Sequence, residues 1–435
     1  MTPETTNSPS SLSRRAFLAR AAGGAAAAMV APSLLRMGSA AASTVQAAGS
    51  SVSGTLTFMS WDTPAVMQPV IAAFNKLYPS VNVEISFTPP VSEYISTLQE
   101  RLLAGTAADI FIYTAENKAQ LNQGNFVRNL SDQPWVKDMA AANLQFMSTP
   151  GGVWGLSPAS WAGGVIYNTK ILAKAGYKQL PGTWSGFLEL CSKLKAMKIT
   201  PYYDAGTPGV ALEALIGTYY KTTYGKNIDP EIFARKISFV DAWEVPLTQY
   251  SELYSEGLVS QAVIGLTGTE MDSELATGKL AMLGSGPWDV ASVQKDNPNI
   301  SLFMGAVPGP AAGQQYWCGA PNEGWAVNAK AHDPAAALVF LSFLASGTGL
   351  KAYMTSSGDI STMSDYTSPV GSALTAAATA ARQSLYYYHG VSWPSEYETP
   401  LTTVLIAELQ SMFQGKATVK QVLQALDAKL KQLLA

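Results

Sequence analysis

The spacing of apolar residues along the chain alternates between two periods. In the segment 81–87 every second residue is apolar and its neighbours are polar, which is the pattern of a strand with one buried face. In 64–78 apolar residues instead recur three or four positions apart, which predicts an amphipathic helix. Strands are also expected at 55–60 and 109–113, with a second helix between them that ends at Gly105. Strands that alternate with helices predict parallel strands joined by helical crossovers, so an α/β unit is expected here.

The middle and the end of the chain favour helices. One helix is expected from 184 to 197, because Pro-Gly-Thr-Trp at 181–184 is a helix start signal and apolar residues follow at helical spacing. Further helices are expected at 213–220, 243–254, 334–344 and 419–433, and strands at 281–283 and 302–307. The final helix is amphipathic through Val422, Leu426 and Leu430.

Composition narrows the class of protein. The 435 residues are too many for one compact core, which favours two or three domains. The chain is 47% hydrophobic and carries a formal net charge of -3, so it is expected to be globular. A nucleic-acid-binding protein would show a basic excess, and none is present, so no nucleic-acid partner is expected.

The first 48 residues have the features of an export signal. Arg14 and Arg15 precede a stretch rich in Ala and Gly, and small residues follow at 39–42 and 45–48. Paired arginines before a weakly apolar region are typical of a twin-arginine signal. The apolar run contains Arg20 and is broken by Pro32, whereas a membrane span needs about 20 apolar residues. With no cysteine near the cleavage sites for a lipid anchor, a soluble protein of the periplasm is expected.

The chain has few residues that bind metals or form disulfides. Its two cysteines, Cys191 and Cys318, could form a disulfide in an oxidising compartment, but two separate packed thiols are expected. With only His332 and His389 as histidines, a zinc site of the His/Cys type has almost no ligands available. No metal and no cofactor are therefore expected.

Several short motifs carry a resemblance to a known family. They are Ile-Tyr-Asn-Thr-Lys at 166–170, Ala-Gly at 175–176, Pro181, Thr183-Trp184 and Phe187, then Gly286-Pro287-Trp288 and Asp-Pro-Ala-Ala at 333–336. Over residues 54–435 the chain resembles the family 1 extracellular solute-binding proteins, the group that includes maltose-binding protein. At 104–110 the chain departs from the family pattern, since Ala108 stands where a proline is common.

The resemblance implies a type II-like periplasmic binding protein fold, with the ligand between two α/β lobes. Lobe one would hold 54–160 and 307–345, and lobe two would hold 165–300 and 350–435. The chain would cross between the lobes near 160–165, 301–307 and 345–350, which places Cys191 in lobe two and Cys318 in lobe one. The implied function is capture of a sugar, expected to be a di- or oligosaccharide, for the permease subunits of an ABC importer. Such a protein is expected to be a monomer and not an enzyme.

Candidate ligand contacts follow from the chemistry of sugars. A sugar presents apolar C–H faces, which flat aromatic rings match, and hydroxyl groups, which fixed polar groups bind. The expected substrate-binding residues are Trp61, Asp62, Tyr113, Glu116, Trp161, Tyr203, Asp204, Trp288, Asp289, Asn322, Glu323 and Trp393. By resemblance, Trp288 and the loop with Tyr113 and Glu116 match known sugar contacts best.

Two other functions compete with sugar capture. A secreted glycoside-acting enzyme would use paired carboxylates, and Glu396 with Glu398 or Asp62 with Glu116 are the available pairs. A binding protein for ferric ion or another small solute would use tyrosines such as Tyr219 and Tyr220. Neighbouring residues on a helix do not face the same way, which argues against that pair. No nucleophile or nucleotide-binding motif is present. The identity, length and linkage of the sugar stay open.

Overall fold

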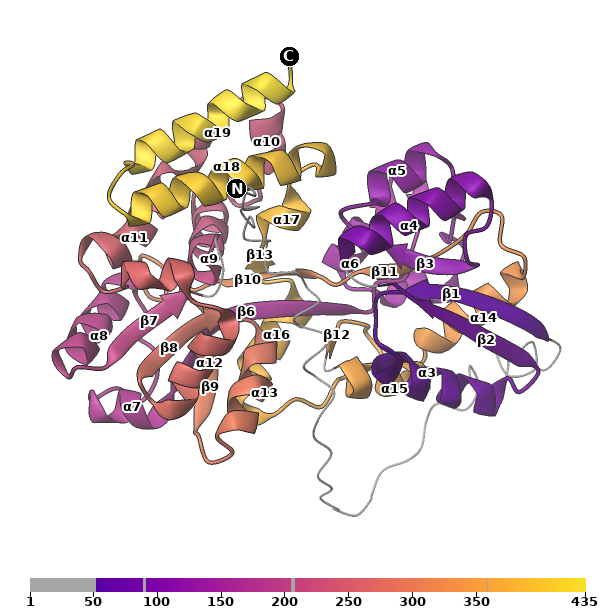
Figure 1. The fold of residues 1–435 in the computed structure, drawn as a ribbon, viewed down its shortest axis with the longest axis horizontal. Coiled ribbons are helices and arrows are strands. Elements are labelled where there is room, and N and C mark those ends of the chain that lie inside the picture. Colours follow the sequence, from indigo (N-terminus) through magenta and orange to yellow (C-terminus); the bar gives the residue numbers. More distant parts are fainter. Residues whose placement is uncertain (1–51, 89–90, 205–207, 358) are drawn as a thin grey trace, which may run out of the picture.

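The computed structural model describes residues 52–88, 91–204, 208–357 and 359–435. The export signal expected in residues 1–48 lies outside this part of the chain. The described chain forms two lobes that lie side by side, each with its own sheet and hydrophobic core (Figure 1). The expected two-lobed α/β architecture is thereby confirmed.

The first lobe is built on a four-stranded sheet in the order β11-β3-β1-β2. β1 (Gly54–Ser60) is parallel to β2 (Val81–Phe87) and β3 (Ile110–Tyr113), and β11 (Gly324–Val327) is antiparallel to β3. The other elements are α3 (Pro64–Leu77), α4 (Val91–Ala104), α5 (Lys118–Gln123), η1 (Pro134–Asp138), α6 (Ala141–Met147), β4 (Ser148–Thr149), β5 (Gly152–Val153), α14 (Pro334–Leu344) and α15 (Gly347–Ser357). Helices α4 and α5 lie on one side of the sheet, and α3 and α15 on the other (Figure 1).

The second lobe is organised around the long strand β6 (Ala159–Asn168), in a sheet of order β13-β10-β6-β8-β7. Its other strands are β7 (Thr200–Asp204), β8 (Leu280–Ser285), β9 (Leu302–Gly305), β10 (Trp317–Pro321), β12 (Ile360–Ser361) and β13 (Tyr386–Tyr387), and both β9 and β12 also pair with β6. Its helices are α7 (Thr169–Lys174), α8 (Trp184–Ala196), α9 (Val210–Tyr219), η2 (Tyr220–Tyr224), α10 (Asp229–Phe233), α11 (Phe239–Ser255), η3 (Gln261–Gly265), α12 (Gly268–Thr277), α13 (Pro287–Asp296), η4 (Ser372–Leu374), α16 (Thr375–Gln383), α17 (His389–Ser392), α18 (Ser395–Phe413) and α19 (Val419–Leu433).

The helix boundaries follow from local chemistry. The side chain of Asn168 accepts hydrogen bonds from the backbone of Lys170 and Ile171, which caps α7 directly after β6. Thr183 caps α8 in the same way, at the start signal that the sequence shows. α19 begins with a capping box at Thr418, whose side chain and backbone exchange hydrogen bonds with Gln421. The amphipathic helix expected at 419–433 is the helix found.

The chain passes between the lobes along three segments, and two of them differ from the expectation. The first runs along β6, where Ala159 belongs to the first core and Ala162 to the second. The second was expected at 301–307 but lies between Cys318 and Trp325, because β10 pairs with β6 and stays in the second lobe. The expected assignment of residues 307–321 to lobe one is therefore wrong.

The third crossing was expected at 345–350 but begins only after Met354, in a stretch where Ile360 belongs to the second core and Met363 still to the first. The reason is α15, which packs against α3 and buries Leu350 and Tyr353 in the first lobe. Cys318 was expected in lobe one but lies in lobe two, because it is on β10 and packs in the same core as Cys191. Both cysteines are free and buried.

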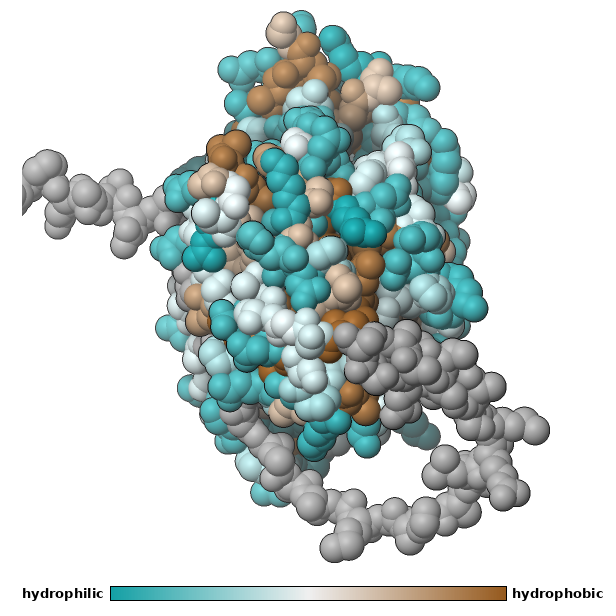
Figure 2. Space-filling view, turned by 90° about the vertical axis from the view of Figure 1, so that its right-hand side faces the viewer, coloured by the Kyte–Doolittle hydropathy of each residue, from teal (hydrophilic) through white to brown (hydrophobic). Residues whose placement is uncertain are grey.

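Among the described residues at the outer end of the first lobe, Figure 2 shows small apolar areas separated by polar ones. Leu77, Phe87 and Leu103 of this lobe are exposed, and single apolar residues of this kind are normal on protein surfaces. Among the described residues, no single helix is long and apolar enough to cross a membrane. α14 and α15 meet that test only as a pair, bent by 73°.

Candidate functional site

Three aromatic side chains from distant parts of the chain meet beside the first crossing. Trp161 lies on β6, Trp288 in the first turn of α13, and Tyr388 directly before α17. The ring centroids of Trp161 and Trp288 are 5.5 Å apart, and those of Trp161 and Tyr388 are 5.6 Å apart. All three rings are half-buried, so each has a part that packs and a part that faces solvent. We call these three residues the aromatic cluster.

Two glycines allow the outer rings of the aromatic cluster to fold back onto the backbone. A Cβ atom at Gly286 would lie 2.1 Å from two ring carbons of Trp288. A Cβ atom at Gly390 would lie 2.6 Å from a ring carbon of Tyr388 and 3.0 Å from its hydroxyl oxygen. Neither ring could hold its place if these positions carried a side chain. The glycine of Gly286-Pro287-Trp288 therefore has a direct structural role in the motif.

A chain of polar groups runs beside the aromatic cluster at the start of β6. Tyr386 donates its hydroxyl hydrogen to Ser160 Oγ at 3.2 Å, and Ser160 donates to Asn143 Oδ1 at 3.0 Å. Ser157 Oγ donates to the carbonyl of Asn322 at 2.8 Å, which ties the first crossing to the second. Asn322 thus contributes its backbone to this junction, and the residue itself is buried.

Three carboxylic acids are buried on the first-lobe side of the junction. They are Asp62 after β1, Glu323 between β10 and β11, and Asp359 between α15 and β12. Burial raises the pKa of Asp62 well above its ordinary value, and the charges of Glu323 and Asp359 raise it further. Burial, followed by the charge of Glu323, raises the pKa of Asp359 to about 7. We call these residues the acidic trio, in which burial and mutual repulsion favour the protonated forms of Asp62 and Asp359.

The surroundings of the acidic trio show which members have fixed partners. Trp61 donates its indole hydrogen to Glu323 Oε1 at 3.0 Å, and its ring packs edge-on against Tyr94 at 5.1 Å. Neither carboxylate oxygen of Asp62 accepts a hydrogen bond in good geometry, although both are buried. Trp61 and Asp62, both expected to contact ligand, are therefore buried beneath the junction and support it in this structure.

The expected contacts at the end of β3, Tyr113 and Glu116, are divided between the interior and the surface. Tyr113 is fully buried, and its hydroxyl oxygen accepts a hydrogen bond from Asn122 at 2.6 Å. Glu116 is exposed and accepts a hydrogen bond from Thr114 at 2.5 Å. Tyr113 pairs with Gly324 across β3 and β11, so this loop adjoins the second crossing, near Glu323.

The second lobe places Asp204 and Asp289 at one edge of its sheet, where the parallel strands β7 and β8 end. Asp204 accepts a hydrogen bond from the backbone of Ala211 at 3.1 Å, so it stabilises the start of α9, and burial raises its pKa to about 7. Asp289 accepts a hydrogen bond from Ser285 at 2.5 Å. Tyr203 is buried in the second core. Open α/β sheets bind ligands at such edges.

Trp393 lies apart from the other expected contacts. Its ring is packed in the second core, 5.5 Å from Phe239 and 5.6 Å from Trp243, and the residue is 3% exposed. Such packing is a core role, so the structure does not bring Trp393 together with Trp161 and Trp288.

Two residues of the site, Tyr388 and Asp359, are not among the contacts expected from the sequence. Tyr388 is the last of three consecutive tyrosines. Tyrosine is a residue type that can bind sugars, so this run was the feature of the sequence that pointed to a contact here. Asp359 offered no signal, because its place beside Asp62 and Glu323 depends on the third crossing.

The side chains named for a ferric site or for a hydrolytic pair have different surroundings in the structure. Among the residues that the structure describes, no group of three or more His, Cys, Asp or Glu side chains could hold a metal ion. Tyr219 and Tyr220 diverge, since Tyr220 is buried and donates its hydroxyl hydrogen to Asp229 at 2.7 Å, while Tyr219 is half-buried. Glu398 accepts a hydrogen bond from Thr402 on its own helix.

Comparison with known proteins identifies the family. Residues 60–349 match the family model described as "Bacterial extracellular solute-binding protein". The multiple sugar-binding protein of Streptococcus mutans is 20% identical over 297 residues, which are 66% of this chain and 70% of that protein.

Solved structures agree with this result. The chain is similar to a family 1 extracellular solute-binding protein from Bifidobacterium longum subsp. infantis, with a TM-score of 0.79, 28% identity, and 87% of this chain and 99% of that chain covered. It also has the fold of RafE in complex with raffinose, with a TM-score of 0.70, 18% identity, and 88% and 100% of the two chains covered. The protein therefore belongs to the family of bacterial extracellular solute-binding proteins.

Proposed function

We propose that the protein captures a di- or oligosaccharide between its two lobes and delivers it to the permease subunits of an ABC importer. The observation that carries the proposal is the aromatic cluster of Trp161, Trp288 and Tyr388 at the lobe junction, beside the polar chain that starts at Tyr386. Half-buried rings next to fixed hydroxyl and amide groups are the combination that sugar faces and sugar hydroxyls require.

The comparisons support a sugar as the solute class. The relative from Streptococcus mutans is named a multiple sugar-binding protein. Among proteins of the same fold, RafE is solved with raffinose, and a sugar transporter from Bacillus licheniformis is solved with stachyose. We infer that this chain takes ligands of similar size, and that it binds them without cleaving them.

The proposed place of action is the periplasm. The twin-arginine segment supports export, and the lack of a cysteine near its cleavage sites argues against a lipid anchor. Cell fractionation tests this directly, and recovery of the mature protein in tight association with the membrane would contradict it.

A thermal-shift panel tests the sugar. Raffinose, stachyose, maltose, chitin oligosaccharides and glucose are each added to the purified protein, with ferric citrate as the rival ligand. A ligand at 100 times its dissociation constant adds about 2.7 kcal/mol to the free energy of unfolding. At least one oligosaccharide is expected to raise the melting temperature and to be recovered intact after prolonged incubation. Stabilisation by the ferric salt alone, or release of cleaved sugar, would overturn the proposal.

A further inference from the structure

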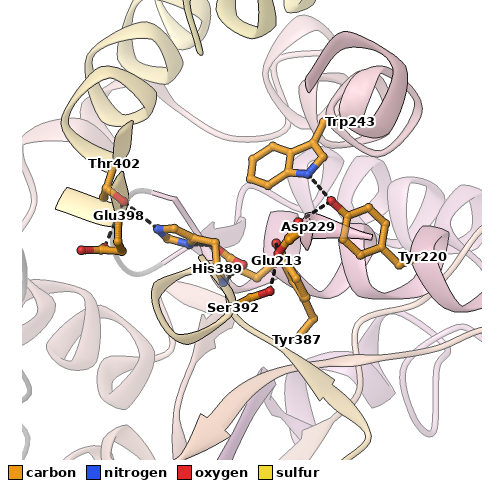
Figure 3. Close-up of polar contacts among 9 residues, drawn as sticks. All are labelled: Glu213, Tyr220, Asp229, Trp243, Tyr387, His389, Ser392, Glu398 and Thr402. Atoms are coloured by element: carbon orange, nitrogen blue, oxygen red, sulfur yellow. Dashed lines mark hydrogen bonds and ion pairs between the residues drawn. The ribbon is translucent and has the colours of Figure 1, made fainter. Parts of the chain in front are cut away.

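Neighbouring residues of the segment 386–393 lie in two different surroundings, the aromatic cluster and the interior of the second lobe. Tyr388 joins the aromatic cluster, whereas the next residue, His389, is 1% exposed and points into the second lobe. Figure 3 shows the buried polar contacts around His389, whose residues come from α9, η2, α10, α11, β13, α17 and α18. We call the nine residues labelled in Figure 3 the buried network. They are Glu213, Tyr220, Asp229, Trp243, Tyr387, His389, Ser392, Glu398 and Thr402.

The first half of the buried network holds His389 from both sides of its ring. Nδ1 forms an ion pair with Glu213, and the backbone nitrogen of His389 donates to the other oxygen of Glu213 at 3.1 Å. Nε2 lies 3.0 Å from the hydroxyl oxygen of Thr402. That hydroxyl already donates its hydrogen to Glu398 at 3.1 Å, so its oxygen accepts from Nε2–H. With both ring nitrogens as donors, the protonated imidazolium is the form of His389 that satisfies these contacts.

The second half of the buried network holds the residues on either side of His389. Asp229 accepts hydrogen bonds from Tyr387 at 2.9 Å and from Ser392. It also accepts one from Tyr220 at 2.7 Å, and Tyr220 in turn accepts one from Trp243 at 2.7 Å. The carboxylate of Asp229 therefore holds the chain at Tyr387 and at Ser392, on both sides of Tyr388.

The direction of Tyr388 follows from these anchors. With Tyr387 and His389 both tied to the interior, the backbone of Tyr388 has one orientation, and Gly390 leaves room for its ring. The ring then meets Trp161 edge-on at 5.6 Å. Binding is tighter when the contact groups are held in place beforehand, because less conformational entropy is lost.

We propose that the buried network is a positioning device for the sugar site, in which His389 and Glu213 fix Tyr388 as a third wall beside Trp161 and Trp288. This inference rests on the proposed function. Tyr388 is a contact residue for the sugar, and His389 acts through it as a positioning residue that never touches ligand.

The charges around His389 give the proposal a pH dependence. Glu213 on α9, Asp229 on α10 and Glu398 on α18 face the imidazolium, and Tyr387 on β13 and Cys318 on β10 lie against the same carboxylates. Burial is the largest single effect and lowers the pKa of His389, but the charge and hydrogen bond of Glu213 and the charges of Glu398 and Asp229 together raise it more, so the net pKa lies above the ordinary value of 6.5. Sugar affinity is therefore constant while His389 is protonated and falls as pH rises through its raised pKa.

The test compares sugar affinity in Glu213→Gln with that of the wild-type protein by calorimetric titration from pH 5 to 9. The amide keeps the shape but loses the charge, so the dissociation constant at pH 6 is expected to rise about five- to tenfold. The alkaline fall in affinity is expected to disappear, and Glu213→Asp is expected to recover part of the affinity. Leu426→Ala, a core truncation on α19 in the same lobe, lowers the melting temperature but leaves the dissociation constant unchanged.

A second variant keeps the proposal testable if Glu213→Gln fails to fold. Gly390→Ala leaves the buried network intact and displaces the ring of Tyr388, so it is expected to lose affinity to a similar extent. Wild-type affinity in either folded variant, with an unchanged pH profile, would overturn the positioning role while the proposed function stands. A wild-type protein that binds no oligosaccharide would overturn both.

Discussion

At the scale of single residues, Trp288 and Trp393 are opposite cases of one residue type. Trp288 is half-buried above Gly286, whereas Trp393 is enclosed by Phe239 and Trp243. Truncating the first removes a surface on which a ligand can stack, and truncating the second leaves a cavity in the core. The two effects are separable, because one changes affinity and the other changes stability.

Trp288→Ala is expected to weaken sugar binding at least about tenfold while the melting temperature of the unliganded protein stays nearly unchanged. Loss of an aromatic anchor at a binding interface commonly costs about 2 kcal/mol or more, which is roughly 30-fold in affinity. Calorimetric titration and a thermal melt of the same preparation measure both quantities. Intact affinity together with early melting would assign Trp288 to the core and move the site elsewhere.

Trp393→Ala is the matched variant, and the expected result is reversed. Removing a buried tryptophan side chain costs about 3–5 kcal/mol of stability. Urea unfolding at pH 7 measures this loss, and Trp393→Phe is expected to recover most of it because an aromatic ring still fills the space. Unchanged stability in Trp393→Ala would show that its packing against Phe239 and Trp243 contributes little.

The sequence alone distinguishes the roles of Trp288 and Trp393 only in part. Trp288 follows a Gly-Pro pair at the end of an expected strand, so its place at the edge of the sheet was predictable. Trp393 precedes a proline, but its burial depends on α10 and α11, which lie about 150 residues earlier in the chain. Tyr388 was missed for a similar reason, since its direction is set by contacts of His389 with Glu213.

At the scale of elements, most regular segments were predictable and the crossings were not. The period-two pattern at 81–87 and the helical pattern at 419–433 correspond to β2 and α19 with the same boundaries. β10 was missed, because Trp-Cys-Gly-Ala-Pro contains two residues that disfavour strands. It is a strand because it pairs with β6, and a pairing partner 150 residues away leaves no local pattern.

Two members of the acidic trio, Glu323 and Asp359, lie at the crossings, and the trio makes stability depend on pH. The pKa of Asp359 is raised to about 7, whereas in the unfolded chain it is close to 3.9. Between these values the folded protein binds a proton that the unfolded chain has lost, so stability falls as pH rises through this window.

Asp359→Asn is expected to flatten that slope, and to stabilise the protein at pH 8 more than at pH 4. Urea unfolding at intervals of one pH unit measures the difference. Asp204→Asn is the comparison in the second lobe, where burial also raises the pKa to about 7 but no other carboxylate contributes. A slope that is the same in Asp359→Asn and in the wild-type protein would exclude a buried proton at the third crossing.

At the scale of the whole molecule, two lobes on three connecting segments form a hinge, and ligand capture is expected to draw the lobes together. Charges near the junction then contribute to closure. Lys118 on α5 of the first lobe packs above the ring of Phe146 at 4.8 Å. Burial lowers the pKa of Lys118, and the charges of Glu116 and of Glu396 on α18 in the second lobe oppose that shift. Opposite charges from the two lobes therefore face one another.

This arrangement predicts that Glu396→Lys weakens sugar binding while stability is little changed, because the like charges resist closure. Charge pairs open to solvent contribute about 0.2–1 kcal/mol, and Glu396 is exposed while Lys118 is half-buried, so the dissociation constant is expected to rise up to about fivefold, and less at 0.5 M salt. The reciprocal exchange Lys118→Glu with Glu396→Lys restores the attraction and is expected to bring affinity back toward the wild-type value. Titrations of the two single variants and the double variant form a complete cycle. Strictly additive losses would show that the two charges do not interact and that closure depends on the ligand and the hinge alone.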